Sequence, residues 1–170
     1  LIDDIIELSR LETSRRKKEA GLVDISSLAH KCVETLSTKT SRKNIKIEVE
    51  CEKCVISGSS EHIYRAILNL VDNAVNYTED GGKIRISCAT EENGCRLSVS
   101  DTGIGIPKES IPRIFERFYR VDAARSRDTG GTGLGLSIVK HIAELHGGSV
   151  SVQSEPGKGS VFTLHFPKKN

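Results

Sequence analysis

Three short segments, rich in glycine and in amide or carboxylate side chains, follow one another along the chain. Residues 69–73 read Asn-Leu-Val-Asp-Asn, residues 101–107 read Asp-Thr-Gly-Ile-Gly-Ile-Pro, and residues 130–136 read Gly-Gly-Thr-Gly-Leu-Gly-Leu. Amide oxygens bind Mg²⁺, a carboxylate accepts hydrogen bonds, and glycines let backbone N–H groups approach phosphate oxygens. Each segment alone is common. Their order together indicates a nucleotide-binding site.

The asparagines Asn69, Asn73 and Asn76 are spaced by four and three residues, so a helix would place them on one face. Apolar residues over 63–75 recur at the same spacings and predict that the opposite face of this helix is buried. A solvated amide stripe is the ordinary interpretation of one such asparagine. Three of them beside a dense apolar face, followed by Tyr77 and Thr78, favour a binding site on this helix.

The glycines Gly131, Gly133 and Gly135 lead into a predicted helix over 133–146, whose positive N-terminus suits phosphate. Thr132 adds a hydroxyl donor. No Gly-Lys-[Ser/Thr] follows, which excludes a Walker loop. No strand leads directly into the loop, which excludes a dinucleotide fingerprint.

The remaining sequence predicts one α/β domain, a two-layer sandwich with helices on one face of a mixed, largely antiparallel sheet. The net charge of +2 does not suggest a nucleic-acid partner, and no apolar run approaches the ~20 residues that span a bilayer. The predicted helices cover residues 25–40, about 60–77 and 133–146, and the predicted strands cover residues 45–51, 55–56, 83–90, 95–101, 149–154 and 160–166.

Over roughly residues 22–167 the chain resembles the ATP-binding catalytic domain of a sensor histidine kinase of the two-component type, in the GHKL superfamily with its Bergerat ATP-binding fold. Residues 114–122, Ile-Phe-Glu-Arg-Phe-Tyr-Arg-Val-Asp, match the phenylalanine box of that family. The resemblance implies ATP and Mg²⁺ as cofactors. It also implies that the γ-phosphate is presented to a histidine on a dimerisation domain and relayed to an aspartate of a response regulator.

The resemblance assigns roles to individual residues. Asn73 matches the metal-binding asparagine, Asn69 a supporting contact, and Tyr77 an aromatic residue near the base. Asp101 matches the aspartate that accepts a hydrogen bond from the adenine amino group, although an Asp-Thr-Gly tripeptide is often only a turn. Thr163 matches a threonine that contacts adenine through water. The other predicted nucleotide contacts are Asn76, Gly103, Ile104, Gly105, Ile106, Arg117, Phe118, Arg120, Gly131, Thr132, Gly133, Leu134, Gly135 and Leu136.

One departure from the family pattern concerns the charge at the phosphates. The family often carries lysine where Asn76 stands, so we expect basic residues between the two glycine segments to supply more of that charge. The composition of residues 108–132 predicts a mobile lid. The candidate basic residues are Arg117, Arg120, Arg125 and Arg127.

None of the five histidines has the His-[Glu/Asp]-x-Arg-x-Pro setting of a phosphoacceptor, so we expect that histidine upstream of Leu1. The chain contains no methionine and is expected to be a piece of a longer protein. Apolar spacing in residues 1–12 predicts a helix that packs against a partner. The resemblance implies that residues 1–21 are the end of the dimerisation hairpin helix and a linker, and that residues 22–170 are the catalytic domain. A surface helix that docks on its own domain is the alternative. The expected partners are the protein's own dimerisation domain in a homodimer and a response regulator. The domain is expected in the cytoplasm, and the parent protein is expected to be anchored in the bacterial cell membrane through its N-terminal part.

Three other functions remain open. An ATPase of the same superfamily would carry a glutamate base four residues before the metal-binding asparagine, but Asn69 stands there. A non-catalytic nucleotide sensor would not need an intact Asn73, Asp101 and full set of glycines. Serine-directed kinases share the fold, and the apolar stripe in residues 1–12 argues against them.

The five cysteines are expected to be reduced thiols. Cys51 and Cys54 have the spacing of metal ligands, but no second close pair accompanies them. A zinc site or a functional disulfide is the alternative.

Overall fold

The computed structural model describes residue 6 and residues 21–121 and 131–168. The strands are β1 (Gly21–Asp24), β2 (Lys46–Cys51), β3 (Val55–Gly58), β4 (Lys83–Glu91), β5 (Gly94–Asp101), β6 (Ser149–Glu155) and β7 (Gly159–Pro167). The helices are α2 (Ile25–Arg42), α3 (Ser60–Tyr77) and α4 (Gly135–Leu145), with one 3₁₀ turn, η1 (Ile111–Arg113).

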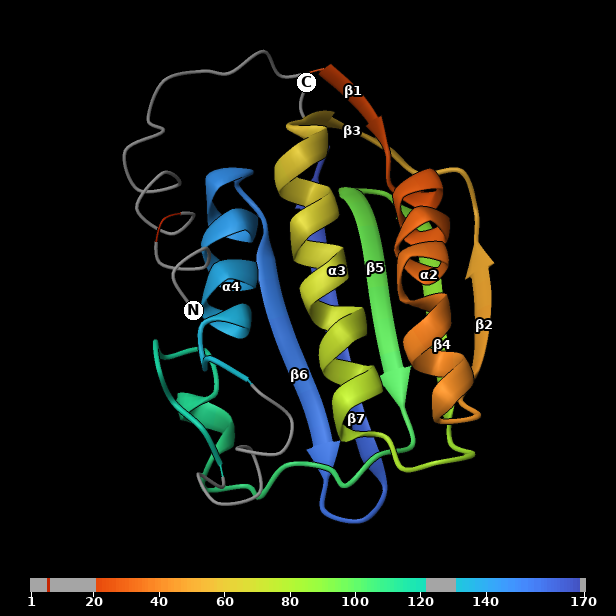
Figure 1. Cartoon of the computed structure of the whole chain (residues 1–170). Helices are drawn as coiled ribbons and strands as arrows, with labels where there is room; N and C mark the ends of the chain where they lie inside the picture. The colour runs from red at the N-terminus through yellow and green to blue at the C-terminus, as the bar shows by residue number, and fades with distance from the viewer. Residues whose placement is uncertain (1–5, 7–20, 122–130, 169–170) are drawn as a thin grey trace.

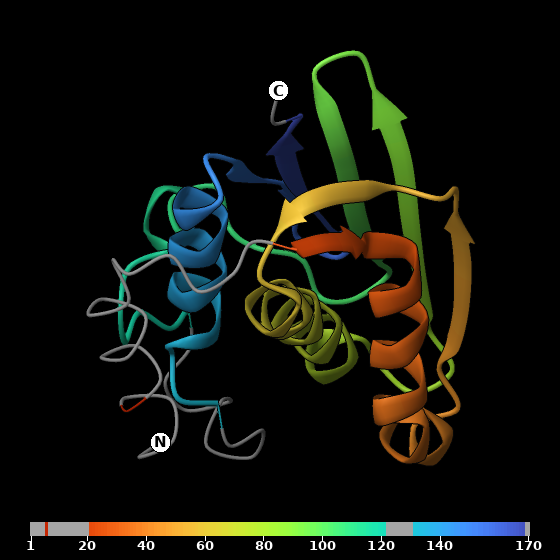
Figure 2. The same cartoon turned by 90° about the horizontal axis from the view of Figure 1, so that it is seen from above.

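The described residues form two layers, as Figures 1 and 2 show. Five strands make one sheet in the order β2-β4-β5-β7-β6, and α2, α3 and α4 lie side by side against one face of it (Figure 1). β2 pairs parallel with β4, and every other pair in this sheet is antiparallel. The predicted fold class is therefore confirmed.

The core lies between these layers, and the central strands supply most of its residues from the sheet. In β4, Ile84 and Ile86 are buried and Arg85 is exposed; in β5, Leu97 and Val99 are buried against the helices. The apolar face of α3 is fully covered, as its helical spacing predicted. It contributes Ile63, Ala66, Ile67, Leu70, Val71, Ala74 and Val75.

A second, two-stranded sheet was not predicted. β1 pairs antiparallel with β3, and Gly21, which the sequence analysis assigned to the linker, lies opposite Gly58. Four residues carry too little pattern to reveal a strand, and only Val23 of β1 is buried. Asp24 then caps α2, accepting a hydrogen bond from the Ser26 N–H at 3.0 Å. The predicted helix over residues 1–12 lies outside the described residues, apart from Ile6, which is helical.

The expectation of reduced thiols is wrong for four of the five cysteines. The structure pairs Cys51 with Cys88 and Cys54 with Cys95 in disulfides, and only Cys32 is free, buried in the core. The register explains the first pair, because Cys51 and Cys88 are direct partners on β2 and β4. Cys95 lies at the start of β5, and the candidate site lies at the other end of that strand.

Candidate nucleotide-binding site

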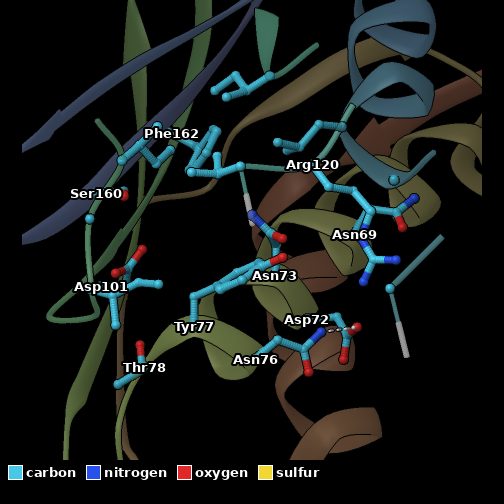
Figure 3. Close-up of a pocket in the computed structure, with 18 of the residues that line it drawn as sticks. Asn69, Asp72, Asn73, Asn76, Tyr77, Thr78, Asp101, Arg120, Ser160 and Phe162 are labelled. Atoms are coloured by element: carbon cyan, nitrogen blue, oxygen red, sulfur yellow. Dashed lines mark hydrogen bonds between the residues drawn. The ribbon is translucent and has the colours of Figure 1, made fainter. Parts of the chain in front are cut away.

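A cavity of about 800 Å³ opens between α3, the end of β5 and the two glycine-rich segments, residues 101–107 and 130–136. Residues from one side of it, Asp101, Ser160 and Phe162, come from the sheet, whereas the asparagines come from α3 (Figure 3). The predicted site residues that line it are Asn69, Asn73, Asn76, Tyr77, Asp101, Ile104, Gly105, Ile106, Arg120, Gly131, Thr132, Gly133, Gly135 and Leu136.

The asparagine face of α3 borders the cavity, as its spacing predicted. Asn73 lies at the centre of this wall in Figure 3, half-buried. Asn69 lies one turn earlier, and its Oδ1 is the atom nearest to Gly135, 3.2 Å from where a Cβ on that glycine would stand. Asn69 therefore lies close to the first residue of α4 and also lines the cavity, and its supporting contact to a nucleotide stays a prediction. Asn76 donates its amide to Asp72 at 3.1 Å.

Asp101 is the most buried carboxylate of the cavity, with 8% of its surface exposed. Burial raises the pKa of its carboxyl group above the ordinary value, although hydrogen bonds from the N–H groups of Gly103 and Ser160 act in the opposite direction. The Gly103 N–H lies 2.8 Å from Oδ1. The carboxylate is thus fixed by the backbone and presents an acceptor to the cavity.

The loop after Asp101 is held against two other segments. The Ile104 N–H donates to the Tyr77 carbonyl at 3.2 Å, and the Ile106 N–H donates to Ser154 Oγ at 2.8 Å. Gly105 has a φ of +70°, and a Cβ there would overlap the Glu155 carbonyl oxygen. Only glycine suits this position without strain. This loop is shaped to fit the surrounding protein and so forms a rigid wall of the cavity.

A backbone hydrogen bond joins the second glycine segment to the residues after η1. The Phe118 N–H donates to the Gly133 carbonyl at 2.9 Å, and we call this contact the backbone neck. Both residues have positive φ, +62° and +74°. A Cβ on Gly133 would stand 2.9 Å from Phe118 Cα, so the close approach requires a glycine. α4 begins at Gly135, two residues later than predicted, and Thr132 Oγ1 accepts the Leu134 N–H at 3.3 Å. The neck brings the two ends of residues 118–133 together at the rim of the cavity.

Five predicted residues do not line the cavity. Gly103 and Leu134 are buried beside it, whereas Arg117 and Phe118 are exposed. Thr163 lies on the face of the sheet opposite the helices, 3.1 Å from the Ser98 hydroxyl, because it alternates with the inward-facing Phe162. Thr163 is therefore not placed to contact a nucleotide in this cavity. Arg125 and Arg127 lie outside the described residues.

Ser160 and Phe162 line the cavity and were not predicted. Ser160 is the direct partner of Asp101 in the β5–β7 register, and it is 6% exposed. Its hydroxyl lies 2.8 Å from that of Ser154. The alternation of residues 160–166, with Phe162, Leu164 and Phe166 inward, was the signal that could have shown that Ser160, and not Thr163, faces the site.

Two lysines of α2 and the loop after it also border the cavity. Lys39 pairs with Asp72 at 2.5 Å. Lys43 donates to the carbonyls of Val75 at 2.8 Å and Thr78 at 2.5 Å, where α3 ends. The sequence did not reveal them because α2 and α3 are brought together only by the fold.

No group of three or more histidine, cysteine or acidic side chains that could hold a metal occurs among the described residues. The zinc alternative for Cys51 and Cys54 therefore has no support in that part of the chain. No described helix is both long and apolar enough to cross a membrane.

Comparison with known proteins agrees with this geometry. Residues 58–170 match the family described as histidine kinase-, DNA gyrase B-, and HSP90-like ATPase. This stretch is more than half of the chain and contains every segment that forms the cavity except α2 and the residue after it. The chain therefore belongs to this family, and within it to the ATP-binding catalytic domains of sensor histidine kinases.

Two relatives illustrate the likeness. The sensor-like histidine kinase SenX3 of Mycolicibacterium smegmatis is 41% identical over 169 residues, which is 99% of this chain and 44% of SenX3. The phosphate regulon sensor protein PhoR of Pseudomonas aeruginosa is 41% identical over 167 residues, which is 98% of this chain and 38% of PhoR. The chain thus spans less than half the length of these two relatives.

Solved structures share the fold. Full-length ShkA in complex with AMPPNP matches with a TM-score of 0.84 and 29% identity, over 99% of this chain and 35% of ShkA. The mycobacterial sensor histidine kinase MprB matches with a TM-score of 0.77 and 29% identity, over 87% of this chain and 97% of that one.

Proposed function

We propose that this chain binds Mg·ATP in the cavity, with adenine at Asp101 and the triphosphate between Asn73 and residues 131–135. The observation that carries the proposal is the buried Asp101 carboxylate, fixed by two backbone N–H groups and open to a cavity large enough for a nucleotide. A carboxylate accepts hydrogen bonds but does not donate them. It therefore fits the amino group of adenine and opposes the carbonyl of guanine.

The residues present fit a magnesium ion that is shared with the ligand. Asn73 offers one neutral oxygen at the cavity wall, and Mg²⁺ takes its remaining ligands from phosphate and water. When bound, the ion would neutralise phosphate charge. Gly131, Thr132 and Gly133 offer backbone groups and a hydroxyl at the opposite rim. The side chains of the chain itself thus bind and orient the nucleotide.

The reaction we propose is transfer of the γ-phosphate to a histidine on a separate dimerisation domain, and from there to an aspartate of a response regulator. The protein positions the phosphate and neutralises its charge, because the attacking imidazole is itself nucleophilic. In the superfamily ATPases a glutamate stands where Asn69 stands here, and an amide cannot act as a general base toward water. Transfer is therefore favoured over hydrolysis. The parent protein would act as a homodimer, with the catalytic domain in the cytoplasm and the anchor elsewhere in the parent.

The test is a phosphotransfer assay with γ-labelled ATP. We expect the chain alone to remain unlabelled, and a separately added dimerisation hairpin from the same kinase to acquire acid-labile phosphate. Label on any of the five histidines of this chain, or steady release of inorganic phosphate without the hairpin, would contradict the proposal.

A further inference from the structure

An ion pair joins α2 to α3 at the edge of the cavity. The Lys39 ammonium donates to Asp72 Oδ1 at 2.5 Å, and the two side chains are 42% and 39% exposed. Both residues line the cavity. An ion pair with this exposure contributes little to stability, because solvent screens the two charges. Lys39 can therefore exchange partners at little cost.

Asp72 connects this pair to the asparagine face of α3. It directly precedes Asn73 in the helix, and its Oδ2 accepts a hydrogen bond from Asn76 Nδ2 at 3.1 Å (Figure 3). Lys39, Asp72 and Asn76 thus form one hydrogen-bonded chain along the α2 side of the cavity. A carboxylate next to the proposed magnesium ligand would repel a triphosphate if Lys39 did not neutralise it.

The other basic side chains of the described cavity are Lys43 and Arg120. The Lys43 ammonium is directed to backbone carbonyls at the end of α3, so it serves to terminate that helix. Arg120 follows Phe118 in the chain and borders the cavity near Asn69 (Figure 3). Lys39, in contrast to Lys43, is held by a half-buried carboxylate side chain on the asparagine-bearing helix.

Resting on the function proposed above, we propose that Lys39 is a phosphate-binding residue of this chain. In the empty cavity Asp72 holds its ammonium at the rim. When Mg·ATP enters, the ammonium moves to the terminal phosphates, whose larger negative charge makes the stronger charge-assisted hydrogen bond. Asp72 keeps its bond to Asn76. Charge at the α2 side of the site is thus supplied from a helix that precedes the matched family region.

The experiment compares nucleotides of different length on three variants by calorimetry. Lys39→Met keeps the aliphatic stem and removes the charge, so the affinity for ATP should fall about tenfold, with a smaller loss for ADP and none for AMP. Asp72→Asn removes the competing carboxylate, so ATP affinity should rise two- to fivefold. Lys31→Met is the matched control, because Lys31 is on the same helix, contacts the Tyr64 ring and does not line the cavity.

Several outcomes would overturn the inference. They are unchanged ATP affinity in Lys39→Met, an equal loss for AMP and ATP, or reduced ATP affinity in Asp72→Asn, since a merely structural ion pair would weaken both variants alike. Thermal unfolding of each variant shows whether it is folded, and a conservative Lys39→Arg change should restore ATP affinity. If the unmodified chain does not bind ATP, the proposed function itself fails, which this comparison detects before any variant is measured.

Discussion

Replacing Asp101 by asparagine should separate nucleotide binding from folding. In the unmodified protein the carboxylate has two oxygens for the N–H groups of Gly103 and Ser160 and for the proposed adenine amino group. An amide has one oxygen, and its NH₂ group donates. The Asp101→Asn variant therefore turns a donor toward one of these three donors.

The expected fall in ATP affinity follows from the hydrogen bond between the Asp101 carboxylate and the adenine amino group, which the variant cannot make. A hydrogen bond to a charged group contributes about 1.5–3 kcal/mol, which corresponds to a fall in ATP affinity of roughly 10- to 150-fold. We expect values in the upper half of this range, because Asp101 is only 8% exposed and water cannot easily replace the lost acceptor.

The same substitution should also change how the free energy of unfolding depends on pH. Burial raises the pKa of Asp101, so the native state keeps its proton at a pH where the unfolded chain has lost it. The resulting stabilisation is complete below the unfolded pKa of about 3.9 and disappears as the pH rises through the native pKa. The Asp101→Asn variant has no carboxyl group at this position, so its free energy of unfolding does not fall over this pH range for this reason. Its stability relative to the unmodified protein should therefore increase with pH over that window and stay constant above it.

The assays are calorimetric titration with ATP and GTP at neutral pH, and urea unfolding at a series of pH values. The unmodified protein should bind GTP much more weakly than ATP. Equal affinities for the two nucleotides, or ATP affinity in the variant within threefold of the unmodified value, would refute the role given to Asp101. A variant that is unfolded at neutral pH would refute the argument about stability.

Three further predictions follow from the described contacts. Asn73→Ala should abolish the part of ATP affinity that depends on Mg²⁺ and leave the affinity measured with EDTA within about twofold; an equal loss under both conditions would remove the metal from its role. Gly105→Ala should lower the unfolding free energy by about 1–3 kcal/mol, because φ is +70° and the added methyl group overlaps the Glu155 carbonyl, whereas Gly131→Ala meets nothing within 4 Å and should change little. Reducing both disulfides should lower the melting temperature, since each closes a loop of 37 or 41 residues and contributes about 4 kcal/mol by loop entropy; a melting temperature unaffected by reductant would contradict the pairing.

The sequence was informative wherever one helix or one turn determines the geometry. The spacing of Asn69, Asn73 and Asn76 is enough to place them together, because a helix has a fixed period. Asp101 and Gly105 belong to one turn whose residue types reveal its shape. The resemblance to the family, and not a local pattern, predicted that these segments meet at one cavity.

The sequence was uninformative wherever the geometry depends on pairing between distant segments. Ser160 reaches Asp101 only through the β5–β7 register, and Lys39 reaches Asp72 only because α2 packs on α3. The pairing of Cys51 with Cys88 needs a parallel register between strands that are not consecutive in the chain. Thr163 is an exception to this rule. The alternation of apolar residues at 162, 164 and 166 is visible in the sequence, and it is enough to place Thr163 on the outer face of the sheet.

The backbone neck has a consequence for engineering. Because the Phe118 N–H and the Gly133 carbonyl are joined by a hydrogen bond, the two ends of the segment between them are held together by the backbone itself. The entropy of closing such a loop grows slowly with its length, by about 0.6 kcal/mol for each doubling. A peptide tag or a small reporter domain inserted between residues 121 and 131 would leave the cavity residues on either side of it, Arg120 and Thr132, unchanged in sequence. The loop after β5 would keep its hydrogen bond to the Tyr77 carbonyl. The neck therefore makes this domain a suitable host for a genetically encoded sensor beside its nucleotide site.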